Sequence, residues 1–358
     1  MRLNQTYINK RIDVPYLLKI GEGKLAKIGK YLSDKEFENV ALFLGEGVEA
    51  LIGDAFFKGL DAFAINVVLK KTATDIDLES IARTAFALPP AVDAIIGIGG
   101  GKALDFAKYA AYLLKLPYIA VPTVMSNDGF CSPSSSLTVA GKRKSVKSGV
   151  PFGVVIDLDI IRDNPDVFLY SGIGDMVSKI TALHDWKNAF RKDGERFNDF
   201  AALMAYNSLD ILFLKHSFNI RAPEFQRSLA NSLLISGVAM EIAGSSRPAS
   251  GSEHLISHAL DTVSVRPKAH GIQVGAATYL CALLQRNENI ADVASVLTNT
   301  GFLDFVGQSP FDRAEFERAL KLAPAIKPDY YTILSESDSF DRAVHYLDTD
   351  ETLKRIVQ

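Results

Sequence analysis

Cysteine is scarce in this sequence. Only Cys131 and Cys281 occur among 358 residues, and they lie far apart in the chain. Two isolated thiols exclude a disulfide-stabilised scaffold and a zinc site of the Cys-x-x-Cys type, and they are typical of a protein kept in a reducing cytoplasm. Cys131 has no candidate base beside it in the sequence, so we expect a packed thiol and not a nucleophile.

Net positive charge and long apolar runs are also missing. The formal net charge is -3, so the chain offers no basic field to a nucleic acid. No stretch approaches the roughly 20 uninterrupted apolar residues that a membrane-spanning helix needs, and the first letters lack the apolar core of a signal peptide. These absences favour a cytoplasmic enzyme that acts on a small molecule, without a nucleic-acid or membrane partner.

The first part of the chain alternates short apolar runs with helical patterns, which is typical of a parallel sheet covered by helices. Strands are predicted at residues 39–45, 63–69, 92–98, 118–123 and 153–158, with helices over 47–60, 75–88 and 102–115. After a boundary near Asp159–Pro165, only long helical stretches follow, such as 200–218 and 225–244. The sequence therefore predicts an α/β domain over residues 1–160 and an all-α domain over residues 161–358.

A glycine cluster, Gly99-Gly100-Gly101, joins a predicted strand to a helix that continues with Lys102 and Ala103. Glycines let the backbone approach a phosphate, and a helix N-terminus offers N–H groups and the positive end of a dipole. A P-loop does not fit, because Ala103 replaces its magnesium-binding hydroxyl. The G-x-G-x-x-G fingerprint does not fit either, because Lys102 stands where its last glycine belongs. We expect a phosphate contact that is not an ATPase loop; a tight turn without a ligand is the alternative.

A loop rich in hydroxyl groups follows the next predicted strand. It contains Thr123, Ser126, Ser132 and, in a turn before a glycine, Asp128. A loop of this kind at the carboxyl end of a strand suits the pyrophosphate, amide or ribose of a cofactor. The same residue types also build ordinary surface turns, so both interpretations stay open here.

A basic run comes directly after the hydroxyl-rich loop. Its members are Lys142, Arg143, Lys144 and Lys147. Such a run is commonly the solvated tip of a hairpin, and its position also allows contact with a phosphate group of a substrate or cofactor.

Two histidines share one face of a predicted helix in the second part of the chain. His254 and His258 are four residues apart, which places them one turn from each other. A Ser250-x-x-Glu253 pattern predicts a capping box at the start of this helix, and Pro267 predicts that the helix ends before it.

A third histidine, His270, heads the next apolar helix. Two imidazoles with a carboxylate, of which Asp175 is the best placed, would suit catalytic zinc or another divalent metal with an open position. Gly172 and Gly174 are predicted to lead into the helix that carries Asp175. Hydrogen-bonded histidines in a polar core are the alternative. We interpret His184, His216 and His345 as structural or surface residues.

Five motifs together resemble those of the sn-glycerol-1-phosphate dehydrogenases. They are GIGGGKALDFAKYAA, PTVMSNDGFCSP, GIGDMVSK, GSEHLISHALD and HGIQVG, in the family's order and spacing over nearly the whole chain. The family lies within the superfamily of glycerol dehydrogenases, iron-type alcohol dehydrogenases and dehydroquinate synthases. The resemblance implies a dehydroquinate synthase-like fold, with an N-terminal NAD(P)-binding domain, a helical domain that binds metal and substrate, and a homo-oligomeric assembly.

The resemblance also implies roles for individual residues. NAD or NADP would be held by Gly99, Gly100, Gly101, Lys102, Ala103, Thr123, Ser126 and Ser132. One divalent metal, zinc in the first place with nickel or iron as alternatives, would be bound by Asp175, His254 and His270. The substrate would be contacted by Asp128, His258 and Asp175.

The reaction implied by the resemblance is hydride transfer between NAD(P)H and dihydroxyacetone phosphate, which gives sn-glycerol 1-phosphate. The metal would act as a Lewis acid on the carbonyl oxygen. The alternatives are a glycerol or other polyol dehydrogenase with an unphosphorylated substrate, a dehydroquinate synthase-like cyclase, and a nucleotide-binding protein without activity. Gly45, at the end of a predicted strand, leaves the choice between NAD and NADP open.

Overall fold

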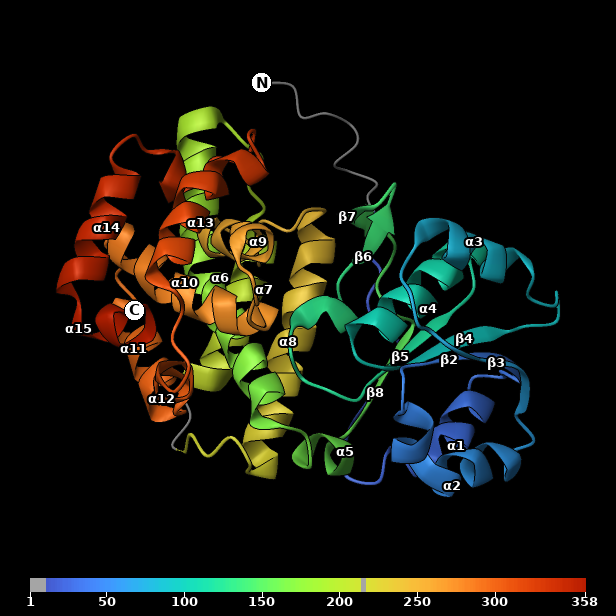
Figure 1. Ribbon diagram of the computed structural model, residues 1–358. Coiled ribbons are helices and arrows are strands. Elements are labelled where there is room, and N and C mark those ends of the chain that lie inside the picture. Colours follow the sequence, from blue (N-terminus) through green and yellow to red (C-terminus); the bar gives the residue numbers. More distant parts are fainter. Residues whose placement is uncertain (1–10, 214–216) are drawn as a thin grey trace. The chain divides into compact units, whose positions relative to one another are not determined.

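The computed structural model describes residues 11–213 and 217–358. Two compact units share the described chain. The α/β unit comprises the chain up to Lys19, Leu25–Val121 and Cys131–Val155, and the helical unit comprises Ile20–Lys24, Pro122–Phe130 and the chain from Ile156 onward. The chain passes for the last time from the α/β unit to the helical unit after Val155, a few residues before the predicted boundary near Asp159–Pro165. The two units are shown in Figure 1 and are described one at a time below.

A six-stranded sheet, with strand order β1-β8-β5-β4-β2-β3, forms the centre of the α/β unit. Its strands are β1 (Leu17–Gly21), β2 (Asn39–Leu44), β3 (Asn66–Thr72), β4 (Ala94–Gly99), β5 (Tyr118–Pro122) and β8 (Gly153–Asp157). Strand β2 runs parallel to both β3 and β4, and β5 runs parallel to β8. Every residue of β4 and β5 is buried, which explains why these strands read as continuous apolar runs.

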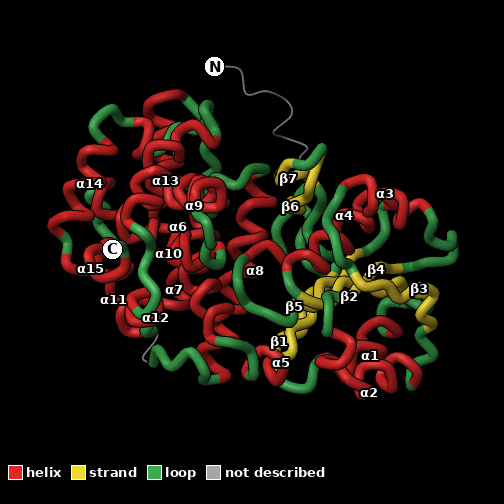
Figure 2. Tube along the Cα trace, viewed as in Figure 1, coloured by secondary structure: helices red, strands yellow, loops and turns green. Residues whose placement is uncertain are grey.

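Helices cover the sheet of the α/β unit (Figure 2). They are α1 (Ile28–Ser33), α2 (Val48–Asp61), α3 (Leu78–Phe86) and α4 (Gly101–Leu114). Asp77 caps α3 by accepting hydrogen bonds from the backbone N–H groups of Glu79 and Ser80, at 3.0 and 3.2 Å. Leu104, Ala107 and Ala111 of α4 are buried as their spacing predicts.

The helical unit contains most of the remaining helices. They are α5 (Leu158–Arg162), α6 (Asp166–Asp193), α7 (Asp199–Phe213), α8 (Pro223–Ala243), α9 (Ser252–Val263), α10 (His270–Leu284), α11 (Ile290–Asn299), α12 (Phe302–Gly307), α13 (Arg313–Ile326), α14 (Ser339–Thr349) and α15 (Glu351–Ile356). The predicted fold class, an α/β part followed by a helical part, is confirmed. None of the helices in the described ranges combines the length and apolar character that a membrane span requires.

Three local predictions are wrong. The sequence predicts no strand between residues 123 and 153, where β6 (Ser134–Val139) forms an antiparallel hairpin with β7 (Lys142–Lys147). The sequence also misses β1. Finally, Gly172 and Gly174 do not precede a helix, because α6 runs without interruption from Asp166 to Asp193 and places both glycines in its interior.

Candidate functional site

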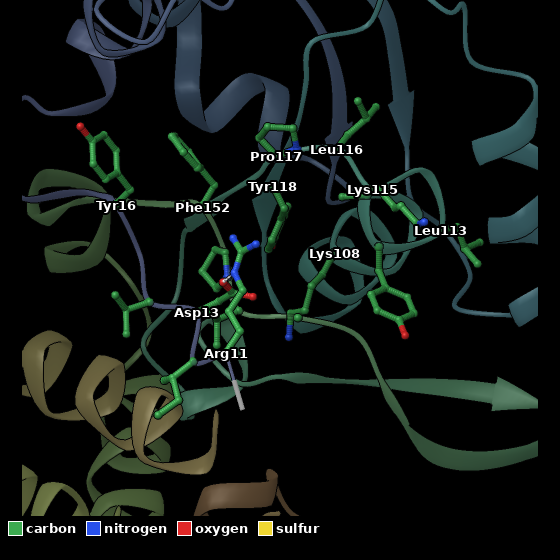
Figure 3. Close-up of a pocket in the computed structure, with 17 residues that line it drawn as sticks. Arg11, Asp13, Tyr16, Lys108, Leu113, Lys115, Leu116, Pro117, Tyr118 and Phe152 are labelled. Atoms are coloured by element: carbon green, nitrogen blue, oxygen red, sulfur yellow. Dashed lines mark hydrogen bonds and ion pairs between the residues drawn. The ribbon is translucent and has the colours of Figure 1, made fainter. Parts of the chain in front are cut away.

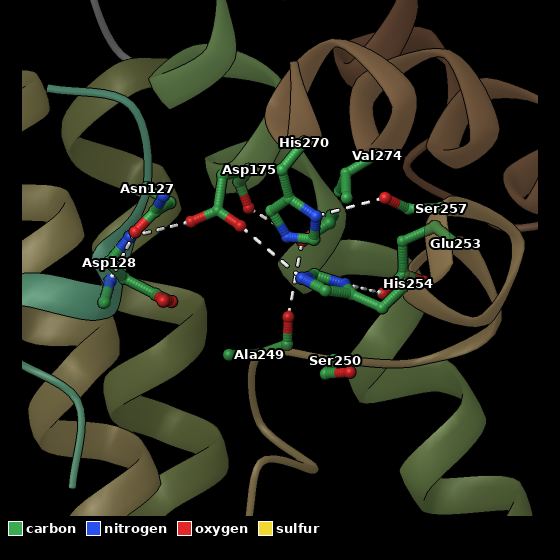
Figure 4. Close-up of polar contacts among 12 residues, drawn as sticks. Asn127, Asp128, Asp175, Ala249, Ser250, Glu253, His254, Ser257, His270 and Val274 are labelled. Carbon is green, nitrogen blue, oxygen red and sulfur yellow. Dashed lines mark hydrogen bonds and ion pairs between the residues drawn. The ribbon is translucent and has the colours of Figure 1, made fainter. Parts of the chain in front are cut away.

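Three side chains from three helices of the helical unit converge on one point (Figure 4). Asp175 of α6, His254 of α9 and His270 at the start of α10 each offer one ligand atom, and these atoms all lie within 4.8 Å of one another. His254 Nε2 is 3.5 Å from Asp175 Oδ1, and the two imidazole rings are 5.2 Å apart between centroids. A carboxylate with two imidazoles fits a divalent transition metal and leaves positions open for further ligands.

Glycines bring the helices with these ligands into backbone contact. A Cβ atom built on Gly174 of α6 would lie 2.0 Å from the carbonyl oxygen of Gly271 in α10. A Cβ atom on Gly271 would lie 1.9 Å from the carbonyl oxygen of Ser171. No side chain fits between α6 and α10 at this crossing. Asp175 and His270, each adjacent in sequence to one of these glycines, are therefore held close together.

Asp175 uses its two carboxylate oxygens differently. Oδ2 accepts a hydrogen bond of 3.0 Å from the backbone N–H of Asp128 and lies 3.5 Å from the Lys179 ammonium, whereas Oδ1 faces His254. Burial alone would raise the pKa of Asp175, but the Lys179 ammonium and the His254 ring lower it well below its usual range. The carboxylate is thus ionised, with one oxygen on the side of the two histidines.

Lys179 is a central residue of the site that the sequence interpretation missed. Its side chain has no exposed surface, and its Nζ lies 3.0 Å from Asp128 Oδ2. Burial would lower the pKa of Lys179, but Asp128 and Asp175 raise it above its ordinary value. The signal was present: a lysine four residues after Asp175 on the same predicted helix faces the same way as Asp175.

Asp128 lies in a short 3₁₀ helix (Asp128–Phe130) of the helical unit. Besides Lys179, it is contacted by the Ser236 hydroxyl, which donates a hydrogen bond of 2.7 Å to Oδ2. Burial, together with the charge of Asp175, raises the pKa of Asp128. Asn127 shapes this loop, since its Oδ1 accepts a 2.9 Å hydrogen bond from the backbone of Gly129.

Glu253 is a partner of His254 and does not form a capping box with Ser250. The predicted capping box is wrong, because α9 begins at Ser252 with Gly251 as its N-cap and no side-chain cap. Glu253 Oε1 lies 2.8 Å from His254 Nδ1, and the Thr181 hydroxyl donates to Oε2 at 2.7 Å. Burial would raise the pKa of Glu253, but the His254 contact and these hydrogen bonds lower it. A carboxylate on Nδ1 orients the imidazole with Nε2 toward Asp175.

His258 lies beside the convergence point and is not one of the three grouped residues. Its side chain is exposed, and its ring stacks on that of His270 with 5.9 Å between centroids. His184 is half-buried and His345 is exposed, whereas His216 lies outside the described residues. The predicted end of α9 before Pro267 is confirmed, since the helix ends at Val263.

The glycine cluster lies at the carboxyl end of β4 in the α/β unit. Gly99 has a φ of +144°, which favours glycine, and Gly100 is the N-cap of α4 without any side-chain cap. Apart from its chain neighbours and the backbone of its own helix, a Cβ atom on Gly101 would meet no atom of the described residues within 4 Å. Lys102 is exposed and Ala103 is buried. Open space before an uncapped helix N-terminus fits the pyrophosphate of a dinucleotide.

The hydroxyl residues of the predicted cofactor loop are divided between the units. Thr123 and Ser126 lie in segment 122–130 of the helical unit, and Ser132 lies in the α/β unit. The Ser132 hydroxyl donates to the carbonyl of Ser134 at 2.9 Å and lies 3.4 Å from Lys108 Nζ. This places Ser132 in a buried polar cluster at the base of the β6–β7 hairpin. Cys131 is also fully buried, as predicted.

The basic run forms strand β7, and Lys142, Arg143, Lys144 and Lys147 are all exposed on it.

A separate cavity of about 1080 Å³ lies in the α/β unit at the amino ends of β5 and β8, lined among others by Lys108, Tyr118 and Phe152 (Figure 3). The glycine cluster is at the opposite, carboxyl end of the sheet. The cavity therefore contains none of the predicted site residues.

Comparison with known proteins agrees with this architecture. The family model described as iron-containing alcohol dehydrogenase matches residues 19–165. The chain is 34% identical over 333 residues to the NAD(P)+ glycerol-1-phosphate dehydrogenase of Metallosphaera sedula, which covers 91% of this chain and 93% of that protein. It is 35% identical over 336 residues to the same enzyme of Aeropyrum pernix, with 91% and 93% of the chains covered.

Solved structures show the same fold. Glycerol dehydrogenase from Schizosaccharomyces pombe superposes with a TM-score of 0.78 at 20% identity, covering 97% of this chain and 92% of that chain. This likeness confirms the predicted fold. The 34% and 35% identity to the archaeal proteins also shows the family. The chain belongs to the glycerol-1-phosphate dehydrogenase family, within the iron-containing alcohol dehydrogenases.

Proposed function

We propose that this chain catalyses the reversible reduction of dihydroxyacetone phosphate to sn-glycerol 1-phosphate with NADH or NADPH. The observation that carries the proposal is the convergence of Asp175, His254 and His270 in a chain whose relatives are named glycerol-1-phosphate dehydrogenases. The donor set suits a catalytic divalent metal, and the uncapped N-terminus of α4 suits a dinucleotide. Both features are needed by a metal-dependent dehydrogenase.

Each bound group would have its own residues. Asp175, His254 and His270 would hold the metal, with zinc as our first choice and nickel or iron as alternatives. Gly99, Gly100, Gly101, Lys102 and Ala103 would hold the pyrophosphate of NAD(P), and Thr123, Ser126 and Ser132 are proposed for the rest of the cofactor. When bound, the nicotinamide supplies the hydride and the metal supplies the Lewis acid that polarises the substrate carbonyl.

The chain's own residues would position the substrate and move the proton. Lys179 and the Ser236 hydroxyl both contact Oδ2 of Asp128, and this carboxylate would accept a hydrogen bond from a substrate hydroxyl. Hydride addition to the carbonyl carbon requires one proton on the oxygen. His258 is exposed beside His270 and would take that proton from water and pass it toward the oxygen.

The test is a substrate comparison on purified protein after metal add-back. Oxidation of NADH or NADPH is measured with dihydroxyacetone phosphate and with dihydroxyacetone, and the reverse reaction with glycerol 1-phosphate and with glycerol. We expect the phosphorylated pair to be preferred in kcat/KM. Preference for the unphosphorylated pair would establish a polyol dehydrogenase instead, and a reaction without net NADH consumption would favour a cyclase.

Four remaining predictions are tested by separate measurements. Metal analysis of the active protein identifies the ion. The ratio of kcat/KM for NADH and NADPH identifies the cofactor, with Gly45 and Glu46 at the end of β2 as the residues to vary. Homo-oligomeric assembly and a cytoplasmic location stay predictions, the first checked by sedimentation and the second by cell fractionation.

A further inference from the structure

We propose that Ser257, Gln273 and Asp261 form a hydrogen-bond relay that fixes the tautomer of His270 and so positions its Nε2 as a metal ligand. The inference rests on the proposed function, in which His270 binds the metal. Ser257 Oγ lies 3.1 Å from His270 Nδ1 and donates a 2.7 Å hydrogen bond to Gln273 Oε1. Gln273 Nε2 in turn donates a 3.1 Å hydrogen bond to Asp261 Oδ1. Figure 4 shows the Ser257 contact with His270.

Asp261 determines which group donates and which accepts in each hydrogen bond of the relay. Asp261 is an exposed carboxylate, and a carboxylate offers only acceptors. The Gln273 side chain must therefore turn its amide nitrogen toward Asp261, because the opposite orientation would bring two oxygens together at 3.1 Å. This choice leaves the amide oxygen of Gln273 facing Ser257.

The protonation of His270 Nδ1 follows from the fact that the Ser257 hydroxyl has a single proton. The Gln273 oxygen cannot donate, so the Ser257 proton is used in that 2.7 Å hydrogen bond. Ser257 then presents a lone pair to His270, and Nδ1 must carry a proton to make the 3.1 Å contact. A neutral imidazole with its proton on Nδ1 has an unprotonated Nε2, which is the nitrogen available to a metal.

Burial and helix spacing protect this arrangement. Ser257 and Gln273 have no exposed surface, so water cannot replace either link. Ser257 and Asp261 are four residues apart on α9, and Gln273 is three residues after His270 on α10, so each pair shares a helix face. His254 receives the same tautomer from the Glu253 carboxylate. Both imidazoles thus carry their proton on Nδ1. The partner of Nδ1 is a carboxylate for His254 and a neutral hydroxyl for His270.

The first test reads the tautomer directly in metal-free protein, where the metal proposal plays no part. With ¹⁵N-labelled histidine the chain gives six imidazole spin systems, assigned by single His→Asn variants. Two-bond ¹H–¹⁵N correlation spectra, recorded at a pH where the ring is neutral, distinguish the tautomers. We expect a proton on Nδ1 of His270. A proton on Nε2 would overturn the proposal.

Gln273→Met is the decisive variant, because it keeps Ser257 and removes only the acceptor that commits its proton. The Ser257 hydroxyl can then donate to Nδ1, and we expect part of the His270 population to move to the Nε2–H tautomer. An unchanged tautomer in this variant would show that the relay does not set it. Asp261→Asn, which permits the amide of Gln273 to turn, should give a smaller change in the same direction.

The second test measures metal affinity by competition with a chelator. Gln273→Met and Ser257→Ala should weaken binding by about 10- to 100-fold, as for other outer partners of metal-binding histidines. Ser257→Thr keeps the hydroxyl and should restore affinity. Ser208→Ala removes a buried serine hydroxyl that donates a hydrogen bond to the Ala205 carbonyl on α7, and should change affinity less than twofold.

The two proposals fail separately. Wild-type protein that binds no divalent metal would overturn the proposed function, while its spectra would still decide the tautomer. Wild-type protein that binds metal, with Gln273→Met and Ser208→Ala equal to it in affinity and tautomer, would overturn the relay alone. Circular dichroism of each variant confirms that a folded protein is compared.

Discussion

The two candidate sites of this protein are built from different parts of the chain. At the end of β4, the α/β unit offers backbone, namely three glycines and the uncapped N-terminus of α4. In the helical unit, Asp175, His254 and His270 are side chains held by other buried polar groups. A backbone site depends on empty space, whereas a side-chain site depends on a network of partners. Substitutions in one site should therefore change metal binding, and substitutions in the other should change NAD(P)H binding.

The largest effect is expected from removing a metal ligand. His254→Ala or Asp175→Ala should abolish metal binding and lower kcat by about a thousandfold, because Lewis-acid stabilisation supplies several kcal/mol. Binding of NADH, followed by fluorescence, should stay within about twofold, because the glycine cluster and the N-terminus of α4 are unchanged in these variants. His345→Ala, an exposed histidine on α14, is the control. Full turnover in a metal-free variant would contradict the proposed function.

The next effect compares two buried lysines, one in each unit. Lys179→Met leaves Asp128 and Asp175 without their cation, and Lys108→Met leaves Asp105, whose Oδ1 lies 3.5 Å from the Lys108 Nζ, without its cation. Breaking such buried interactions should lower the free energy of unfolding by about 3 kcal/mol in each variant. Only Lys179→Met should also lose metal affinity and kcat, as measured on the folded fraction. Equal losses of kcat in both variants would show that Lys179 has no special role in catalysis compared with Lys108.

A smaller effect is expected at the backbone site. Gly101→Val fills space that no protein atom occupies, so the fold should persist while the KM for NAD(P)H rises at least about tenfold, or about 1.4 kcal/mol. Metal content should not change. Gly149→Val, at another glycine with nothing within 4 Å, is the matched control. An unaltered KM would mean that the cofactor does not lie against this helix terminus.

The smallest effect concerns acid stability. The pKa of Glu253 is lowered in the folded protein, although burial acts against this, because His254, Thr181 and the Gly251 N–H favour the carboxylate. Its contribution to stability is therefore present above the unfolded value of 4.5 and is lost as the pH falls further. Urea unfolding of metal-free protein below pH 4.5 should be less pH-dependent for Glu253→Gln than for wild type. The exposed Glu351→Gln should behave like wild type; identical slopes in all three proteins would refute the assignment.

The sequence was most informative where a feature is local. Strands β2, β4 and β5 are apolar runs with buried side chains throughout their centres, and glycines mark the turn after β4, so both were predicted. Strands β6 and β7 were not predicted, although the basic run was interpreted as a hairpin tip, because their serines and lysines have low strand propensity and are fixed by pairing. The continuity of α6 was missed because its glycines serve contact with α10, which is not visible in the local sequence.

The three side chains proposed as metal ligands could be found from the sequence, and the side chains that contact them could not. The spacing and type of His254, His258 and His270 drew attention to this helix pair, and the resemblance selected the ligand set. Glu253 was instead interpreted as a cap, because a Ser-x-x-Glu pattern commonly has that meaning. Lys179 and Ser257 acquire their roles only when three helices pack together, and a single sequence records no such contact.

Lys179 has a consequence for the charge balance of the site. Two ionised carboxylates in a dry interior would repel each other, and a site of this kind could depend on its metal to fold. Here the ammonium of Lys179 already lies 3.0 Å from Asp128 and 3.5 Å from Asp175. The helical unit therefore carries its own counter-charge, and the two buried carboxylates do not depend on a metal ion to supply it.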